Sequence, residues 1–184
     1  NEATGYIELV LQYIPGRSLY QYVFQSDYEF TDPTVVFYGA QLALALKFLH
    51  DIGVFYRDLS FRNILIHAKT GNAILIDFNC SIRLEAGQMI EPNGTVQPGT
   101  IGFQCEEAMS RSKPYGMMAD WFSLGVVLYG LFNGGDRPFG YVTYSWEEGF
   151  YFDRERANLW SNARGLISPC SKKFIEKLLL PLDD

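Results

Sequence analysis

The chain has 184 residues, enough for one compact domain or one large lobe of a domain, and its 48% hydrophobic and 20% charged residues do not favour disorder. A net charge of -6, with no basic run longer than Lys172-Lys173, argues against a nucleic-acid partner. The longest apolar stretch, Leu124 to Phe132, is about half of the ~20 residues that a transmembrane helix needs, so we expect no membrane span. The three cysteines are far apart and odd in number, which favours a reducing, cytoplasmic setting over a zinc or disulfide framework.

Two short elements are predicted at the start of the chain, followed by a long helix. Ile7 to Leu11 is apolar and runs into a Pro-Gly turn, which predicts a strand, and Ser18 to Gln25 predicts a short helix. Asp32 then opens a helix as its capping residue, with Pro33 at the first helical position. Apolar and small residues recur at helical spacing from there, and Gly53 predicts the end of this helix.

The middle of the chain predicts a small β-hairpin and a long loop. Two apolar runs, Ile64 to Ile66 and Ala73 to Ile76, flank a turn that contains Gly71-Asn72. Asp77 follows the second run directly. Residues 79–107 have little periodicity and many Gly and Pro residues, and a loop of that length inside a compact domain is usually functional.

The C-terminal half predicts two more helices. Ala119 to Phe132 is apolar nearly all round, which indicates a helix buried at the centre of the fold. Ser171 to Leu180 has the pattern of an amphipathic helix. Residues 133–139 are predicted to form a loop. Residues 140–168 are rich in aromatic side chains, but no period in them places an element.

Three motifs follow one another along the chain. They are the loop Tyr56-Arg57-Asp58-Leu59-Ser60-Phe61-Arg62-Asn63, then Asp77-Phe78-Asn79, then Cys105-Glu106-Glu107. Taken singly, Asp58 and Asn63 could simply bond the loop backbone. In this order and spacing, the motifs resemble the His-Arg-Asp, Asp-Phe-Gly and Ala-Pro-Glu motifs of protein kinases. Residues 99–100, 120–125 and 137–139 match that family as well, so the resemblance covers essentially the whole chain.

The resemblance implies a fold and a boundary. The fold would be mainly α, of the α+β class: the helical C-terminal lobe of a kinase with a small β-hairpin and with the N-lobe largely absent. Residues 1–184 would then be the hinge and C-lobe of a partial kinase domain. No Gly-rich loop and no strand Lys of the Val-Ala-Ile-Lys type occurs in the chain, so we expect these residues alone to have negligible activity. Tyr56 and the run Val35 to Gln41 resemble the AGC group of Ser/Thr kinases.

The resemblance also implies the reaction, which is transfer of the γ-phosphate of ATP to a hydroxyl of a protein substrate. Phosphoryl transfer depends on positioning and on neutralisation of charge. Asp58 would accept the proton of the substrate hydroxyl. Asn63 and Asp77 would hold Mg²⁺, which prefers hard oxygen ligands. The implied cofactors are therefore ATP and Mg²⁺.

Several other positions receive roles from the same resemblance. Backbone groups of Gln12 and Ile14 would bond the adenine edge, and Leu65 would form the floor under the base, a position that is also ordinary core. Tyr56 and Phe78 would belong to the hydrophobic spine that links the two lobes.

Two acidic residues are expected to be structural rather than catalytic. Glu107 would pair with an Arg of the lower lobe, and Asp120 would tie the central helix to the backbone of the catalytic loop.

Some positions depart from the family pattern. Ser60 stands where Ser/Thr kinases place a Lys that contacts the transferring phosphate, and Arg62 could replace that cation or could be a solvated surface residue. Asn79 replaces a Gly, and Asn tolerates the left-handed backbone region better than most residues. Cys105-Glu106 replaces Ala-Pro, and for Cys105 a small packing role is favoured over that of a reactive thiol.

These departures leave a rival function open. A pseudokinase, which keeps the fold as a binding or scaffold module without turnover, is the alternative to an active protein kinase. A small-molecule kinase of related fold fits less well, because the segment around Glu107 resembles a docking loop for a protein substrate.

Overall fold

The computed structural model describes residues 9–93, 97–110, 113–139, 143–145, 149–151, 159–160, 163–164 and 166–181. The elements follow in the order β1 (Gly16–Ser18), α1 (Leu19–Phe24), α2 (Asp32–Asp51), β2 (Val54–Phe55), β3 (Ile64–His67), β4 (Ala73–Leu75), β5 (Ile82–Arg83), α3 (Glu106–Met109), α4 (Met118–Phe132), β6 (Thr143–Ser145), β7 (Gly149–Tyr151) and α5 (Pro169–Leu178).

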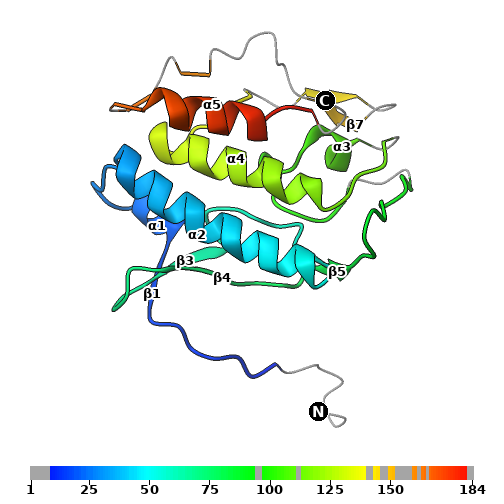
Figure 1. The fold of residues 1–184 in the computed structure, drawn as a ribbon, viewed down its shortest axis with the longest axis horizontal. Helices are drawn as coiled ribbons and strands as arrows, with labels where there is room; N and C mark the ends of the chain where they lie inside the picture. Colours follow the sequence, from blue (N-terminus) through cyan, green and yellow to red (C-terminus); the bar gives the residue numbers. More distant parts are fainter. Residues whose placement is uncertain are drawn as a thin grey trace.

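Three helices form successive layers beside a small sheet. In Figure 1, α5, α4 and α2 lie one below another, and β3 and β4 follow beyond α2. Every residue of α4 from Phe122 to Phe132 is buried, which confirms the prediction of a central helix. Gly125 lets α5 approach closely, since a Cβ there would lie 2.8 Å from the Cβ of Leu178.

Within the part of the chain that the structure describes, no helix is long and apolar enough to cross a bilayer.

The long predicted helix is confirmed as α2, but its cap differs from the prediction. Thr31 is the capping residue and Asp32 is the first helical residue. The Asp32 carboxylate instead accepts a hydrogen bond of 3.1 Å from the backbone N–H of Ser168, the capping residue of α5. Asp32 therefore contacts the start of α5 instead of capping its own helix.

The predicted hairpin is confirmed as β3 and β4, and β1 adds to it as a third antiparallel strand. The predicted strand at Ile7 to Leu11 is wrong for residues 9–11, which form no strand and are largely exposed, while residues 7 and 8 lie outside the described residues. The strand begins at Gly16 instead. A Cβ at Gly16 would lie 2.2 Å from the carbonyl oxygen of Ile66, so close pairing with β3 requires glycine here.

The long loop after the hairpin is mostly irregular, as predicted, but it contains short pairings. Strand β5 pairs antiparallel with β2, and Ile90 forms a single bridge with Tyr115. Because β2 and β5 pair, the loop that follows β2 is held beside the residues that follow β4. The later prediction of an amphipathic helix is confirmed as α5, which begins at Pro169, two residues before the expected start. Strands β6 and β7 pair in the region for which no element was predicted.

Candidate functional site

The loop between β2 and β3 is folded around the side chain of Asn63. Its amide nitrogen donates to the carbonyl oxygen of Asp58 at 2.9 Å and to Oδ2 of the same residue at 2.8 Å. The backbone N–H of Asn63 donates to the carbonyl oxygen of Ser60 at 3.1 Å. Asn63 is 8% exposed, so these bonds fix the Asp58 side chain from inside the loop.

The other carboxylate oxygen of Asp58 is held from a distant part of the chain. Its Oδ1 accepts hydrogen bonds from the backbone N–H of Thr100 at 2.8 Å and from the Thr100 hydroxyl at 2.6 Å. Both oxygens of Asp58 are thus held by hydrogen bonds, which keep the carboxylate in one position. The sequence pointed to residues 99–100 only as a family match and gave no signal for this contact.

Asp120, in the first turn of α4, organises the backbone at the start of the loop. Its buried carboxylate accepts hydrogen bonds from the N–H groups of Tyr56 at 3.0 Å and Arg57 at 2.9 Å. His50 Nε2 lies 2.8 Å from Asp120 Oδ2. Arg57 has a φ of 70°, an unusual conformation that these bonds support. This geometry is the structural role expected for Asp120.

Asp77 lies at the same end of the hairpin as Asn63. The N–H of Ile76 donates to the carbonyl oxygen of Asn63 at 3.0 Å, which places residue 77 next to the loop. Asp77 has a φ of 59° and an exposed carboxylate, whose Oδ1 accepts from the N–H of Asn79 at 3.3 Å. The left-handed conformation that was considered for Asn79 therefore occurs at Asp77 instead.

Asn63 and Asp77 each carry an oxygen of the kind that Mg²⁺ prefers. The amide nitrogen of Asn63 donates to Asp58, so the amide oxygen is the atom of this side chain that could bind a metal. The exposed Asp77 carboxylate supplies a second hard oxygen ligand at the same end of the hairpin.

Tyr56 and Phe78 pack together beneath the site. Their ring centroids are 5.1 Å apart and nearly perpendicular, and the Tyr56 hydroxyl donates to the carbonyl oxygen of Ile76. Burial, together with the nearby Asp58 and Asp77 carboxylates, raises the pKa of Tyr56 far above its usual range. Tyr56 is therefore a neutral hydrogen-bond donor that joins the loop to the residue before Asp77.

Comparison with known proteins decides the family. A model described as "Protein kinase domain" matches residues 1–181, nearly the entire chain. The chain belongs to the protein kinase domain family. Similar proteins include Serine/threonine-protein kinase Sgk1 of Xenopus tropicalis, 36% identical over 135 residues that cover 72% of this chain and 30% of that protein. Sgk1 of Fundulus heteroclitus is 39% identical over 68% of this chain and 28% of its own length.

A third relative is Ribosomal protein S6 kinase alpha-4 of Homo sapiens, 32% identical over 72% of this chain and 17% of its own length. The kinase domain described here therefore spans less than a third of the length of these curated relatives. The relatives confirm the resemblance to AGC Ser/Thr kinases.

The positions assigned to the nucleotide lie in two different settings in this kinase domain. Leu65 is in β3, opposite Ser18 of β1 and two residues after Asn63. Gln12 is exposed, and Ile14 lies near it in the segment before β1, which runs away from the helices in Figure 1. The structure thus places Leu65 two residues after Asn63, and the roles of Leu65, Gln12 and Ile14 in binding adenine stay predictions.

The departures from the kinase pattern have clear structural consequences. Ser60 is 1% exposed, so its hydroxyl replaces a Lys at a buried position. Arg62 is exposed and its guanidinium lies 4.0 Å from the centre of the Tyr20 ring, a cation–π contact that the sequence did not predict.

Cys105 and Glu107 belong to the interior of the domain. Cys105 is fully buried, its Sγ accepts from the N–H of Ala108 at 3.4 Å, and burial raises the pKa of its thiol far above the usual range. Glu107 is 3% exposed. These observations favour the packing interpretation of Cys105 over the reactive-thiol interpretation.

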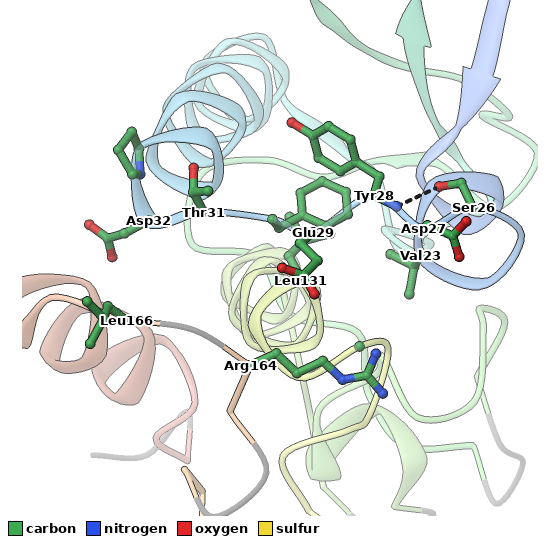
Figure 2. Close-up of a pocket in the computed structure, with 13 residues that line it drawn as sticks. Val23, Ser26, Asp27, Tyr28, Glu29, Thr31, Asp32, Leu131, Arg164 and Leu166 are labelled. Atoms are coloured by element: carbon green, nitrogen blue, oxygen red, sulfur yellow. Dashed lines mark hydrogen bonds between the residues drawn. The ribbon is translucent and has the colours of Figure 1, made fainter.

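One cavity in the described part of the chain lies away from Asp58. It has a volume of about 660 Å³ and is bounded by the connection between α1 and α2, by Leu131 at the end of α4, and by Arg164 and Leu166. Figure 2 shows Arg164 across the cavity from Glu29, and no residue of the loop between β2 and β3 lines it. We therefore do not assign this cavity to phosphoryl transfer.

Proposed function

We propose that the protein that carries this chain transfers the γ-phosphate of ATP to a Ser or Thr hydroxyl of a protein substrate. Residues 1–184 would supply the hinge and C-lobe of its kinase domain. The observation that carries the proposal is the geometry of Asp58, whose two carboxylate oxygens are oriented by Asn63 and Thr100. A carboxylate fixed in this way is prepared to accept the proton of an attacking hydroxyl.

In the proposed mechanism, Asp58 orients the substrate hydroxyl and takes its proton as the oxygen bonds to the γ-phosphorus and the bond from that phosphorus to the ADP oxygen breaks. Asn63 and Asp77 would hold Mg²⁺, which when bound would neutralise charge on the phosphates. Leu65 and the backbone of Gln12 and Ile14 would bind the adenine base.

Arg62 is the remaining catalytic residue in this proposal. Ser60 supplies no charge at the position of the usual Lys, so we assign that charge to the Arg62 guanidinium, two residues later in the loop. The contact between Arg62 and Tyr20 supports a fixed position for that charge.

The test is incorporation of radiolabelled phosphate from ATP by the full-length protein. We expect Asp58→Asn to lower the rate by about 10²–10⁴-fold, the usual contribution of a positioned general base. Equal incorporation by the two proteins would remove Asp58 from the mechanism. The isolated chain of 184 residues is expected to show negligible turnover.

A pseudokinase is the second candidate, and the buried Ser60 in place of a Lys favours it. A pseudokinase would bind partners and show no transfer in either the wild type or Asp58→Asn. Transfer that depends on Asp58 would reject this candidate.

A further inference from the structure

A second, smaller cavity lies beside the Asp58 loop. It has a volume of about 160 Å³, and its walls come from α1, the loop after β2, the segment around Thr100 and the segment that follows α4. Thr100 lines this cavity and also bonds the Asp58 carboxylate. The cavity is therefore a direct neighbour of the group that would orient the substrate hydroxyl.

The charged lining of this cavity is entirely positive. Arg62 and Arg137 line it, and no Asp or Glu does. Among the described residues, neither guanidinium lies within 4.0 Å of a carboxylate. Two neighbouring cations without an acidic partner in the described part of the chain are typical of a site for an anion from outside it.

Aromatic rings position both guanidinium groups. Arg62 lies 4.0 Å from the centre of the Tyr20 ring, and Arg137 lies 5.8 Å from the centre of the Phe103 ring. Contact with a ring face leaves the N–H edge of a planar guanidinium open for hydrogen bonds to a carboxylate or phosphate. Both cations are thus held in place before an anion arrives.

The Ser60 hydroxyl gives independent support for an anion-binding site in this cavity. It lines the same cavity, it is 1% exposed, and its buried hydroxyl has no hydrogen-bond partner among the described residues. Leaving a buried hydroxyl without a partner is unfavourable, so such groups are usually satisfied by a ligand or water. An anion in the cavity would accept a hydrogen bond from Ser60.

The size of the cavity limits the ligand. Sites for small molecules usually begin at about 300 Å³, whereas this cavity suits a single side chain of an extended peptide. We propose that Ser60 and Arg137 form a specificity subsite for an acidic side chain of the protein substrate, close to its phosphate-accepting residue and beside the catalytic Arg62. This inference rests on the proposed function, since it names the substrate class of the same site.

The experiment compares peptides on the full-length protein. One set carries a Ser acceptor, with Glu, Gln or Lys placed in turn at each of the flanking positions, and kcat and KM are measured. A second set carries Ala at the acceptor and a fluorescent label, so that binding is measured without transfer. We expect one flanking position where Glu exceeds Gln by about tenfold in kcat/KM and in affinity, mainly through KM, and where Lys is worst.

Charge reversal at Arg137 is the decisive variant. Arg137→Glu should make the Lys peptide better than the Glu peptide at that position, and Arg137→Gln should abolish the preference. Arg164→Glu is a matched control in the larger cavity and should keep the preference for Glu. Melting temperatures of all variants show that a changed preference does not come from unfolding.

The outcomes separate this inference from the proposed function. Equal affinity and equal kcat/KM for Glu and Gln peptides, or an unchanged preference in Arg137→Glu, would overturn the acidic subsite while transfer persists. Preferential binding of Glu peptides without any transfer would support the subsite and reject the kinase reaction. If Arg62→Gln lowers kcat for all peptides alike and leaves the preference intact, Arg62 acts on the transferring phosphate and is not part of the subsite.

Discussion

Thr100 donates two hydrogen bonds to one carboxylate oxygen of Asp58, although 42 residues separate them in the sequence. The backbone bond would remain with any residue but proline at position 100, whereas the 2.6 Å bond depends on the hydroxyl. The two contributions can therefore be separated by mutation.

The first prediction concerns that hydroxyl. Thr100→Val keeps the shape and the backbone bond but removes an O–H donor to a charged acceptor, a bond worth about 1.5–3 kcal/mol. If the bond orients Asp58 for catalysis, kcat falls by about tenfold or more with little change in the KM for ATP, and Thr100→Ser restores most of it. Steady-state kinetics on the full-length protein check this, and an unchanged kcat in Thr100→Val would contradict it.

The sequence predicted the candidate site residues but not the contacts that hold them. Asp58, Asn63 and Asp77 could be proposed from the sequence because they belong to short motifs whose order follows the chain. The pairing of Asp58 with Thr100 could not be predicted, because it joins the loop after β2 to a segment without periodicity. The cavity between Arg62 and Arg137 was missed for the same reason, since 75 residues separate these two arginines in the sequence.

The fold also was predicted better where a segment's own residues determine its structure than where a distant strand does. Helix α4 was predicted with nearly correct bounds, because its apolar residues leave no exposed face. The strand expected at Ile7 to Leu11 failed for residues 9–11 because a strand needs a partner. Strand β3 pairs with Gly16 to Ser18 instead.

The second prediction concerns Asp120, which is 1% exposed. Asp120→Ala leaves the backbone N–H groups of Tyr56 and Arg57 without their acceptor, so we expect a loss of about 3 kcal/mol or more in the free energy of unfolding. Urea unfolding of the domain measures it. Asp51→Ala is the control, since it removes an exposed pair with Lys47 and should cost only about 0.5 kcal/mol.

The third prediction distinguishes the thiols. Cys170 is exposed, whereas Cys105 is fully buried and has a pKa raised by burial. At about pH 7, iodoacetamide should therefore modify Cys170 in the native protein and should react with Cys105 only after unfolding. Mass spectrometry of tryptic peptides reads both sites at once. Equal labelling of the two cysteines in the native protein would show that Cys105 is accessible and revive a reactive role.

The fourth prediction concerns the link between α2 and α5. Burial alone would raise the pKa of Asp32. Hydrogen bonds from Ser171 and Ser168 nevertheless hold this pKa below its ordinary value of 3.8. A carboxyl group with a lowered pKa in the folded state stabilises that state fully above the unfolded value, and the contribution is lost as the pH falls through the folded pKa.

Asp32→Asn should therefore reduce the free energy of unfolding by about 0.5 kcal/mol near neutral pH, because the site is partly solvated. The difference between the wild type and Asp32→Asn should shrink once the pH falls below 3.8. Urea midpoints measured across this range test it, with Asp27→Asn in the connection before α2 as the matched control. A difference that stays constant from neutral to acidic pH would show that the Asp32 charge contributes nothing to the contact between the two helices.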